Sequence, residues 1–223
     1  MKNPQGFWAV AALFCAAASL PAVTVTDGSS AGFTNGSTNA RVGTWNTDTA
    51  GNTAPFNGFI GSDTSSNFSA SWTFDYSSIS DTITSATLEL GIYDIDSAAA
   101  LDEVASYTEG SVDLTSLLNS AANALNGSTG AKNNEYDLLT ITLPSTTFAD
   151  LATGTVDISL ALQGPGLGTL GNTSFNGAGI DISTLTINTQ ETSSTPEPAT
   201  LTLLLASGCL ICLIAGFRRL RRA

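Results

Sequence analysis

Apolar and polar residues alternate strictly in two neighbouring stretches of the chain, residues 68–74 and residues 83–92. Because successive side chains of a β-strand point to opposite faces of its sheet, this period predicts two strands that each bury one face. The buried residues would be Phe68, Ala70, Trp72 and Phe74 in the first strand, and Ala86, Leu88, Leu90 and Ile92 in the second. The linker between them is rich in Asp and Ser, so we expect these strands to begin one antiparallel sheet with a solvated outer face.

Four later stretches have the composition of half-buried strands, rich in Thr, Val, Ile and Leu. They are residues 104–107, 136–143, 155–162 and 184–188. Two short strands are predicted nearer the N-terminus, at residues 23–26 and 41–46. The rest of this N-terminal region is rich in Gly, Asn, Ser and Thr, and we expect it to form loops over an edge of the core.

One stretch, residues 114–125, has the period of a helix. Its predicted apolar stripe is Leu114, Leu117, Leu118, Ala121 and Leu125. Asp113 is a suitable N-cap, and Asn126-Gly127 a suitable end. About seven or eight strands with one short connecting helix predict an all-β fold, namely an antiparallel, jelly-roll-like β-sandwich over residues 23–190.

The first 22 residues have the pattern of a secretory signal peptide. Lys2 precedes an apolar run from Phe7 to Ala18, and small residues follow it. The run is too short to span a bilayer comfortably, so we predict cleavage after Ala22, with Ala18 as the second choice. The domain that follows would therefore be exported through the inner membrane.

Residues 199–217 are uncharged and mostly aliphatic, and we predict a transmembrane helix there. Nineteen residues of helix are about 28 Å long, which is close to the thickness of the hydrocarbon core. The four arginines of the tail 218–223 would stay on the cytoplasmic side. They are Arg218, Arg219, Arg221 and Arg222. Residues 191–198 form the linker outside the membrane.

The sequence Pro196-Glu197-Pro198, the single apolar span and the terminal arginines together resemble the PEP-CTERM sorting signal of exopolysaccharide-producing Gram-negative bacteria. This resemblance implies an exosortase-like membrane enzyme as partner, cleavage near the tripeptide, and a transient anchor. A permanent C-terminal anchor is the alternative. Residues 68–97 are also similar to cell-surface sandwich modules often found upstream of such signals, a resemblance that implies no activity.

Charge and composition narrow the function of the mature region. Residues 23–195 hold 18 of the chain's 19 acidic residues and two of its seven basic residues, a net charge of −16. This charge argues against nucleic acid and anionic membrane surfaces as partners. The chain has no histidine, and its three cysteines lie in the two terminal segments, which argues against His-dependent catalysis and against disulfides in the domain. A carboxylate-pair hydrolase stays open as an alternative.

Acidic residues gather just after the strand that ends at residue 92. Asp94 and Asp96 would project to the same face there, Asp102 or Glu103 would return nearby, and Asp181 could come from a neighbouring loop. Oxygen ligands in this number suit Ca²⁺, although the spacing is not that of an EF-hand. The alternative is a solvated acidic loop without any cofactor.

These observations predict an exported, non-enzymatic cell-surface or extracellular-matrix protein. It would be anchored transiently by its C-terminal helix and then act at the cell surface or outside the cell, with extracellular polysaccharide as a candidate partner. The alternative is a carbohydrate-binding module, Ca²⁺-dependent or not, with surface aromatic side chains stacking on sugar rings. The candidate aromatics are Trp45, Tyr76, Tyr93 and Tyr107.

Overall fold

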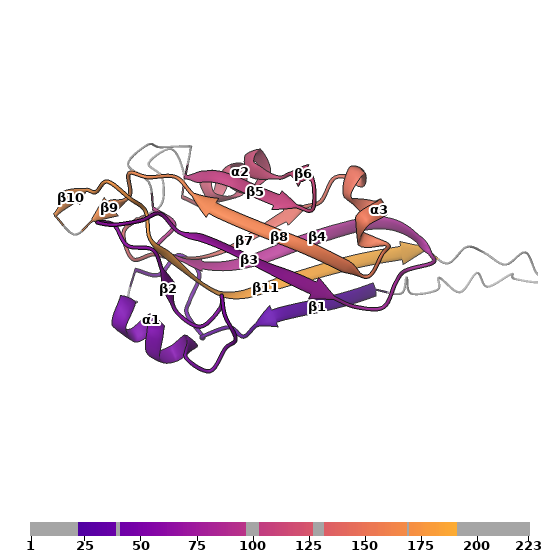
Figure 1. Ribbon diagram of the computed structural model, residues 1–223, viewed down its shortest axis with the longest axis horizontal. Coiled ribbons are helices and arrows are strands. Elements are labelled where there is room, and N and C mark those ends of the chain that lie inside the picture. Colours follow the sequence, from indigo (N-terminus) through magenta and orange to yellow (C-terminus); the bar gives the residue numbers. More distant parts are fainter. Residues whose placement is uncertain (1–21, 39–40, 97–102, 127–131, 169, 191–223) are drawn as a thin grey trace, which may run out of the picture.

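The computed structural model describes residues 22–38, 41–96, 103–126, 132–168 and 170–190 (Figure 1). Antiparallel strands are the main regular structure of these residues and few residues form helices, which confirms the predicted all-β class. The predicted signal peptide up to residue 21, the linker 191–198, the segment 199–217 and the tail 218–223 lie outside the described residues. Within the described ranges, no helix is both long and apolar enough to cross a membrane.

The first sheet has the strand order β1-β11-β4-β7, and the short strand β2 also pairs with β11. Its strands are β1 (Ala22–Gly28), β2 (Phe59–Ile60), β4 (Thr82–Tyr93), β7 (Tyr136–Thr142) and β11 (Ala178–Gln190). The second sheet has the order β3-β8-β5-β6. Its strands are β3 (Ser69–Asp75), β5 (Val104–Glu109), β6 (Val112–Asp113) and β8 (Thr155–Leu162). A separate small hairpin pairs β9 (Leu167–Gly168) with β10 (Gly171–Asn172).

The two strictly alternating strands, β3 and β4, do not share a sheet, so the prediction that they begin one sheet is wrong. β3 pairs with β8, whereas β4 pairs with β11 and β7. Alternation indicates which face of a strand is buried but not which strand lies beside it, because pairing depends on contacts far apart in sequence. Their buried faces are as predicted, since Trp72 and Phe74 of β3 and Leu88 and Leu90 of β4 belong to one core.

That core is a single apolar cluster to which both sheets contribute, as expected of a β-sandwich. Ile158 and Leu160 of β8 face it from the second sheet, and Leu185 and Ile187 of β11 face it from the first. Because β3 and β8 bury alternate side chains, their outer residues are mostly Ser, Thr and Asp.

The predicted helix is present as α2 (Thr115–Asn126). Asp113 Oδ1 accepts a hydrogen bond from the backbone N–H of Thr115, at 2.9 Å, and so holds the start of the helix. The buried face of α2 is narrower than the predicted stripe. Leu118 and Ala122 are buried together with Leu114, while Leu117 and Leu125 are exposed.

Residues 42–46 are helical and only Arg41 before them is extended, so the prediction of a strand over residues 41–46 is wrong. They belong to α1 (Val42–Thr49), and a further short helix, α3 (Phe148–Leu151), follows the 3-10 turn Ser145–Thr147. In α1 the hydroxyl of Thr49 donates to the backbone oxygen of Trp45 at 2.8 Å. Burial of Trp45 in an aromatic cluster holds this turn of chain in place. Weak intrinsic helix propensity is thus overridden by tertiary packing.

The elements α1, β2, β9 and β10 gather at one end of the molecule (Figure 1). β1 begins and β11 ends at the opposite end (Figure 1). Ala22 at the start of β1 pairs with Asn188 near the end of β11. The two chain ends of the domain are therefore neighbours. The loop after β2, which carries Asp63, lies at the other end of the molecule.

Candidate functional site

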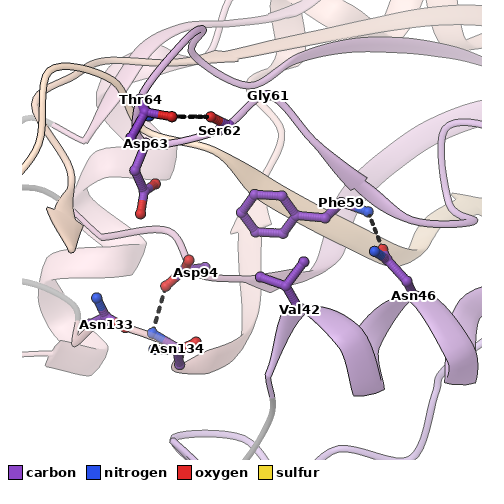
Figure 2. Close-up of a pocket in the computed structure, with 10 residues that line it drawn as sticks. All are labelled: Val42, Asn46, Phe59, Gly61, Ser62, Asp63, Thr64, Asp94, Asn133 and Asn134. Carbon is purple, nitrogen blue, oxygen red and sulfur yellow. Dashed lines mark hydrogen bonds between the residues drawn. The ribbon is translucent and has the colours of Figure 1, made fainter. Parts of the chain in front are cut away.

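A pocket of about 520 Å³ opens among the loops at the end of the molecule near α1 and β2 (Figure 2). Polar side chains make up most of its lining, with Phe59 and Val42 as the apolar exceptions. The polar residues include Ser62, Asp63, Thr64, Asp94, Asn133 and Asn134. No Lys or Arg is among the described residues that line the pocket. Its chemistry is therefore that of an oxygen-rich, negatively charged site.

Asp94 enters this pocket where β4 ends. Its backbone N–H donates to the backbone oxygen of Glu135 at 2.7 Å, and its Oδ1 accepts the backbone N–H of Asn134 at 2.5 Å. The φ angle of Asp94 is +66°, a left-handed conformation that Asp tolerates better than most residues. This turn ends the strand and directs the carboxylate into the pocket (Figure 2).

Asp96 lies two residues further on and is more deeply buried, with 1% of its surface exposed. Its Oδ1 accepts the backbone N–H of Leu167 at 2.8 Å, and the side-chain amide of Asn176 donates to its backbone oxygen. Its Oδ2 is also buried and has no hydrogen-bond partner among the described residues. A buried carboxylate oxygen without a partner is costly, so this atom marks an unsatisfied position in the fold.

Asp63 is the acidic residue that sequence reasoning missed. It comes from the loop after β2, and its carboxylate points across the pocket toward Asp94 (Figure 2). Its Oδ1 accepts the backbone N–H of Gly177 at 3.4 Å. Residue 63 lies among Ser and Thr residues of an irregular segment, so no periodicity indicated where its side chain would point.

Neighbouring carboxylates influence the protonation of Asp94 and Asp96. Burial raises the pKa of Asp94 to about 7, the N–H of Asn134 opposes this rise, and nearby Asp63 adds to it. Burial likewise raises the pKa of Asp96 to about 8, with further increases from Asp94, Asp63 and Glu103 and an opposing effect of the Leu167 N–H. The carboxylates of Asp63, Asp94 and Asp96 are thus near enough to repel one another.

The sequence hypothesis for calcium named four residues, and the structure brings two of them together. Asp94 and Asp96 are neighbours at the end of β4, and Asp102 lies outside the described residues. Asp181 is part of β11 instead of a loop. Its Oδ2 accepts the N–H of Ala31 at 2.8 Å, and the Tyr136 hydroxyl donates to its Oδ1 at 3.2 Å. Burial raises the pKa of Asp181, and these two donors oppose the rise.

Within the described ranges, no group of three or more His, Cys, Asp or Glu side chains is arranged as a ready metal-binding set. The Asp63, Asp94 and Asp96 carboxylates therefore form an open cluster.

Three of the four aromatic side chains expected to stack on sugar rings are buried and cannot contact a sugar at the surface. Trp45 and Tyr93 have no exposed surface, and Tyr107 is 1% exposed. Trp45 is stacked between Phe33 and Tyr93, with ring centroids 5.2 Å and 5.0 Å away. Tyr76 is partly buried against the core. These rings are structural because their apolar area is used in packing.

A second, smaller pocket of about 280 Å³ lies on the outer face of the second sheet. It is lined mainly by hydroxyl groups and one carboxylate, and the residues include Ser71, Thr73, Thr108, Asp157 and Ser159. The Thr73 hydroxyl donates to Asp157 Oδ1 at 2.6 Å across β3 and β8. This surface offers hydrogen-bond donors and acceptors beside Trp72 and Ile158.

The chain matches no protein-family model and no curated protein sequence.

Proposed function

We propose that this protein is an exported, non-enzymatic cell-surface or extracellular-matrix protein that an exosortase-like membrane enzyme cleaves near Pro196-Glu197-Pro198. The observation that carries the proposal is the ordered C-terminal pattern of the tripeptide, the apolar span 199–217 and the arginines of 218–223. The two prolines favour an extended backbone, which a processing enzyme can bind. The segment 199–217 would be the transient membrane anchor.

The position of the domain's chain ends supports this proposal. β1 begins at Ala22, the residue after which the signal peptide is expected to be cut, and β11 ends at Gln190, just before the expected linker. Cleavage after Ala22 would remove a single residue from β1. Since Ala22 pairs with Asn188, one end of the sandwich would face the membrane while the protein is anchored.

We also infer that the sandwich is a jelly roll. The strand orders β1-β11-β4-β7 and β3-β8-β5-β6 support this inference. Apart from β2 and the small β9–β10 hairpin, eight strands form two four-stranded sheets, and the chain crosses between the sheets at every connection except β5 to β6. This is the pattern of two interlocked Greek keys. The architecture is shared by proteins of many functions, so it does not by itself indicate an activity.

The test of the proposal is the intact mass of the protein released from cells that produce it. We expect a species that begins near Val23 and ends between Thr195 and Pro198. A species that still carries the arginine tail would show a permanent single-pass anchor and would overturn the sorting proposal. A P196A/P198A double variant should keep its tail, whereas a P144A variant in the folded domain should be cleaved normally.

Saccharide binding is a second candidate function, favoured by the hydroxyl-lined pocket over β3, β5 and β8. Such a pocket would bind sugar hydroxyl groups through hydrogen bonds. A pull-down on a panel of polysaccharides should then lose signal in D157N but not in D48N, since Asp48 is exposed on α1. Equal retention of both variants would exclude this pocket, and release of reducing ends from the same panel would contradict the non-enzymatic assignment.

A further inference from the structure

We propose that the pocket at the end of the molecule near α1 and β2 binds a neutral saccharide. The side chains that would contact the sugar are Asn46, Phe59, Asp94, Asn133 and Asn134. The inference does not depend on the sorting proposal, because it concerns only residues of the folded domain. It shares its ligand class with the second candidate function but concerns different residues from the pocket over β3, β5 and β8, so either pocket can fail alone.

The pocket has the size and the lining of a small-ligand site. Its volume of about 520 Å³ lies within the range of about 300–1,000 Å³ that such sites occupy. Its lining comes from four segments that are far apart in the sequence. They are helix α1, strand β2 with the loop after it, the end of β4, and the residues before β7. Polar side chains that converge from separate segments on one hollow are typical of a binding site.

Two asparagine side chains in this lining each keep an unused hydrogen-bond donor. Asn46 Oδ1 accepts the backbone N–H of Phe59 at 2.7 Å, and Asn134 Oδ1 accepts the Tyr93 hydroxyl at 2.6 Å. These contacts use the oxygen of each amide and hold its side chain in orientation. Neither Nδ2 has a partner among the described residues, so both remain as donors for a ligand.

Asp94 and Asn133 each keep an unused acceptor. Asp94 is only 5% exposed, its Oδ1 accepts the N–H of Asn134 at 2.5 Å, and its Oδ2 has no partner in the described part of the chain. Asn133 donates its Nδ2 to the backbone oxygen of Leu167, which leaves its Oδ1 as an acceptor. A largely buried carboxylate oxygen that reaches a pocket without a donor (Figure 2) is a strong acceptor for a ligand hydroxyl.

This mixture of donors and acceptors fits hydroxyl groups. Each sugar hydroxyl both donates and accepts, so neighbouring hydroxyls on one ring can bind the Asp94 carboxylate and an asparagine amide together. An anionic sugar fits poorly, because Asp63 and Asp94 are acidic and no Lys or Arg is among the described residues that line the pocket. The lining therefore favours a neutral saccharide.

Phe59 supplies an apolar wall for the C–H face of a sugar ring. It is half-buried, and its ring points into the pocket (Figure 2). The ring packs edge to face on Tyr93, with centroids 6.0 Å apart, and a Cβ added at Gly177 would lie 2.6 Å from Phe59 Cε1. Gly177 thus leaves room for the ring and Tyr93 orients it, so a ligand would not have to order this side chain. A sugar ring can pack on such a preformed aromatic surface.

Calorimetric titration of neutral tetrasaccharides of glucose, mannose and galactose into the full-length chain tests the proposal. The chain is solubilised in a zwitterionic detergent, because a detergent with a sugar headgroup would compete for the site. We expect saturable binding of at least one of the three, and weaker binding of the anionic tetragalacturonic acid. The proposal is overturned if none of the three binds at millimolar concentration, or if only the acid binds.

Two isosteric variants change the unused atom and keep the contact that the fold uses. D94N keeps an oxygen for the Asn134 N–H but presents an amide in place of Oδ2, and asparagine tolerates the left-handed backbone of residue 94. N46D keeps the acceptor for the Phe59 N–H but presents a carboxylate oxygen in place of Nδ2. We expect each variant to bind about tenfold more weakly, because a hydrogen bond to the ligand is lost and an unmatched polar atom takes its place.

The ring of Phe59 and the position of the site have their own variants. F59L keeps an apolar side chain without the ring, and it should weaken binding about threefold. D48N is the matched control, since Asp48 is exposed on the same helix as Asn46 and does not line the pocket. Thermal unfolding would identify a variant that fails to fold, and the folded variants then decide. Loss of binding in D157N but not in D94N or N46D would place the sugar over β3, β5 and β8 and overturn the proposal.

Discussion

Gly179 lies directly against the indole ring of Trp45, so that a Cβ added to this glycine would overlap the ring. Gly179 pairs with Tyr93 on one side of β11 and with Phe59 on the other. The absence of a side chain at this point makes room for Trp45, which joins α1 to the first sheet and has no exposed surface. A single methyl group therefore decides whether α1 can pack.

Replacement of Gly179 by alanine should destabilise the fold. The added methyl group must displace a buried indole, and overpacking of this kind costs about 1–3 kcal/mol. Urea unfolding followed by tryptophan fluorescence would measure the change, because the environment of Trp45 should change as well. The φ angle of Gly179 is not in the left-handed region, so the expected loss is steric.

Gly43 in α1 provides the control for this substitution. A Cβ at Gly43 would meet nothing within 4 Å. Alanine is favoured over glycine inside a helix by about 0.5–1 kcal/mol, so G43A should leave stability unchanged or raise it. If G179A lowers the free energy of unfolding no more than G43A does, then Trp45 does not pack against Gly179 of β11.

Replacement of Tyr136 by phenylalanine should also destabilise the fold. The Tyr136 hydroxyl donates to the buried Asp181 carboxylate at 3.2 Å, and Asp181 has no exposed surface. Loss of the Tyr136 hydroxyl leaves the Asp181 carboxylate with one hydrogen-bond donor fewer, which should lower the free energy of unfolding by about 1–3 kcal/mol. Chemical denaturation of both proteins at the same pH measures the difference.

The same substitution at Tyr107 should behave differently. Tyr107 is buried like Tyr136, but its hydroxyl has no hydrogen-bond partner within the described ranges. Removal of an unsatisfied buried hydroxyl is neutral or stabilising, because its desolvation is no longer required. A cost in Y107F equal to that in Y136F would show that the Asp181 contact contributes nothing specific.

Two leucines at opposite extremes of burial test the position of the core. Leu160 in β8 has no exposed surface, whereas Leu170 beside the β9–β10 hairpin is fully exposed. L160A should cost about 2–5 kcal/mol through lost burial and a residual cavity. L170A should change stability by less than about 0.5 kcal/mol. Thermal unfolding of the pair measures both, and a large effect of L170A would mean that this leucine is buried by contacts that the structure does not show.

Local pattern predicted most of the strands and their buried faces, because the period of alternation depends only on backbone geometry. It could not assign β3 and β4 to opposite sheets, since the choice of partner is made by β8 and β11 much later in the chain. It also failed at residues 41–46, where Trp45 and Gly179 pack together across a long sequence separation. In both cases long-range packing overrides the local signal.

The candidate site was predictable only in part for the same reason. Asp94 and Asp96 follow a well-defined strand, so their position at its end could be expected. Asp63 lies in an irregular loop, and it reaches the pocket only because β2 pairs with β11. Asp181 was expected in a loop, but β11 begins earlier than the alternation suggested and holds this residue within the sheet.

Glu109 makes the stability of the fold dependent on pH. It lies at the end of β5 with no exposed surface, and in the part of the chain that the structure describes neither of its carboxylate oxygens has a hydrogen-bond partner. Burial raises its pKa to about 7 from an ordinary value of 4.5, and the nearby acid Asp150 raises it further. Between these two values the unfolded chain has lost its proton while the folded chain keeps it. Stability should therefore fall as pH rises from about 4.5 to about 7, and this contribution should be constant at higher pH.

The variant E109Q removes this contribution, because glutamine is neutral at every pH. The melting temperature of E109Q relative to wild type should therefore rise between pH 5 and pH 8. D48N, at the exposed Asp48 of α1, is the control and should show a constant difference from wild type over the same range. If the difference between E109Q and wild type does not change with pH, then Glu109 is ionised in the folded protein, and its side chain must have a partner or solvent access.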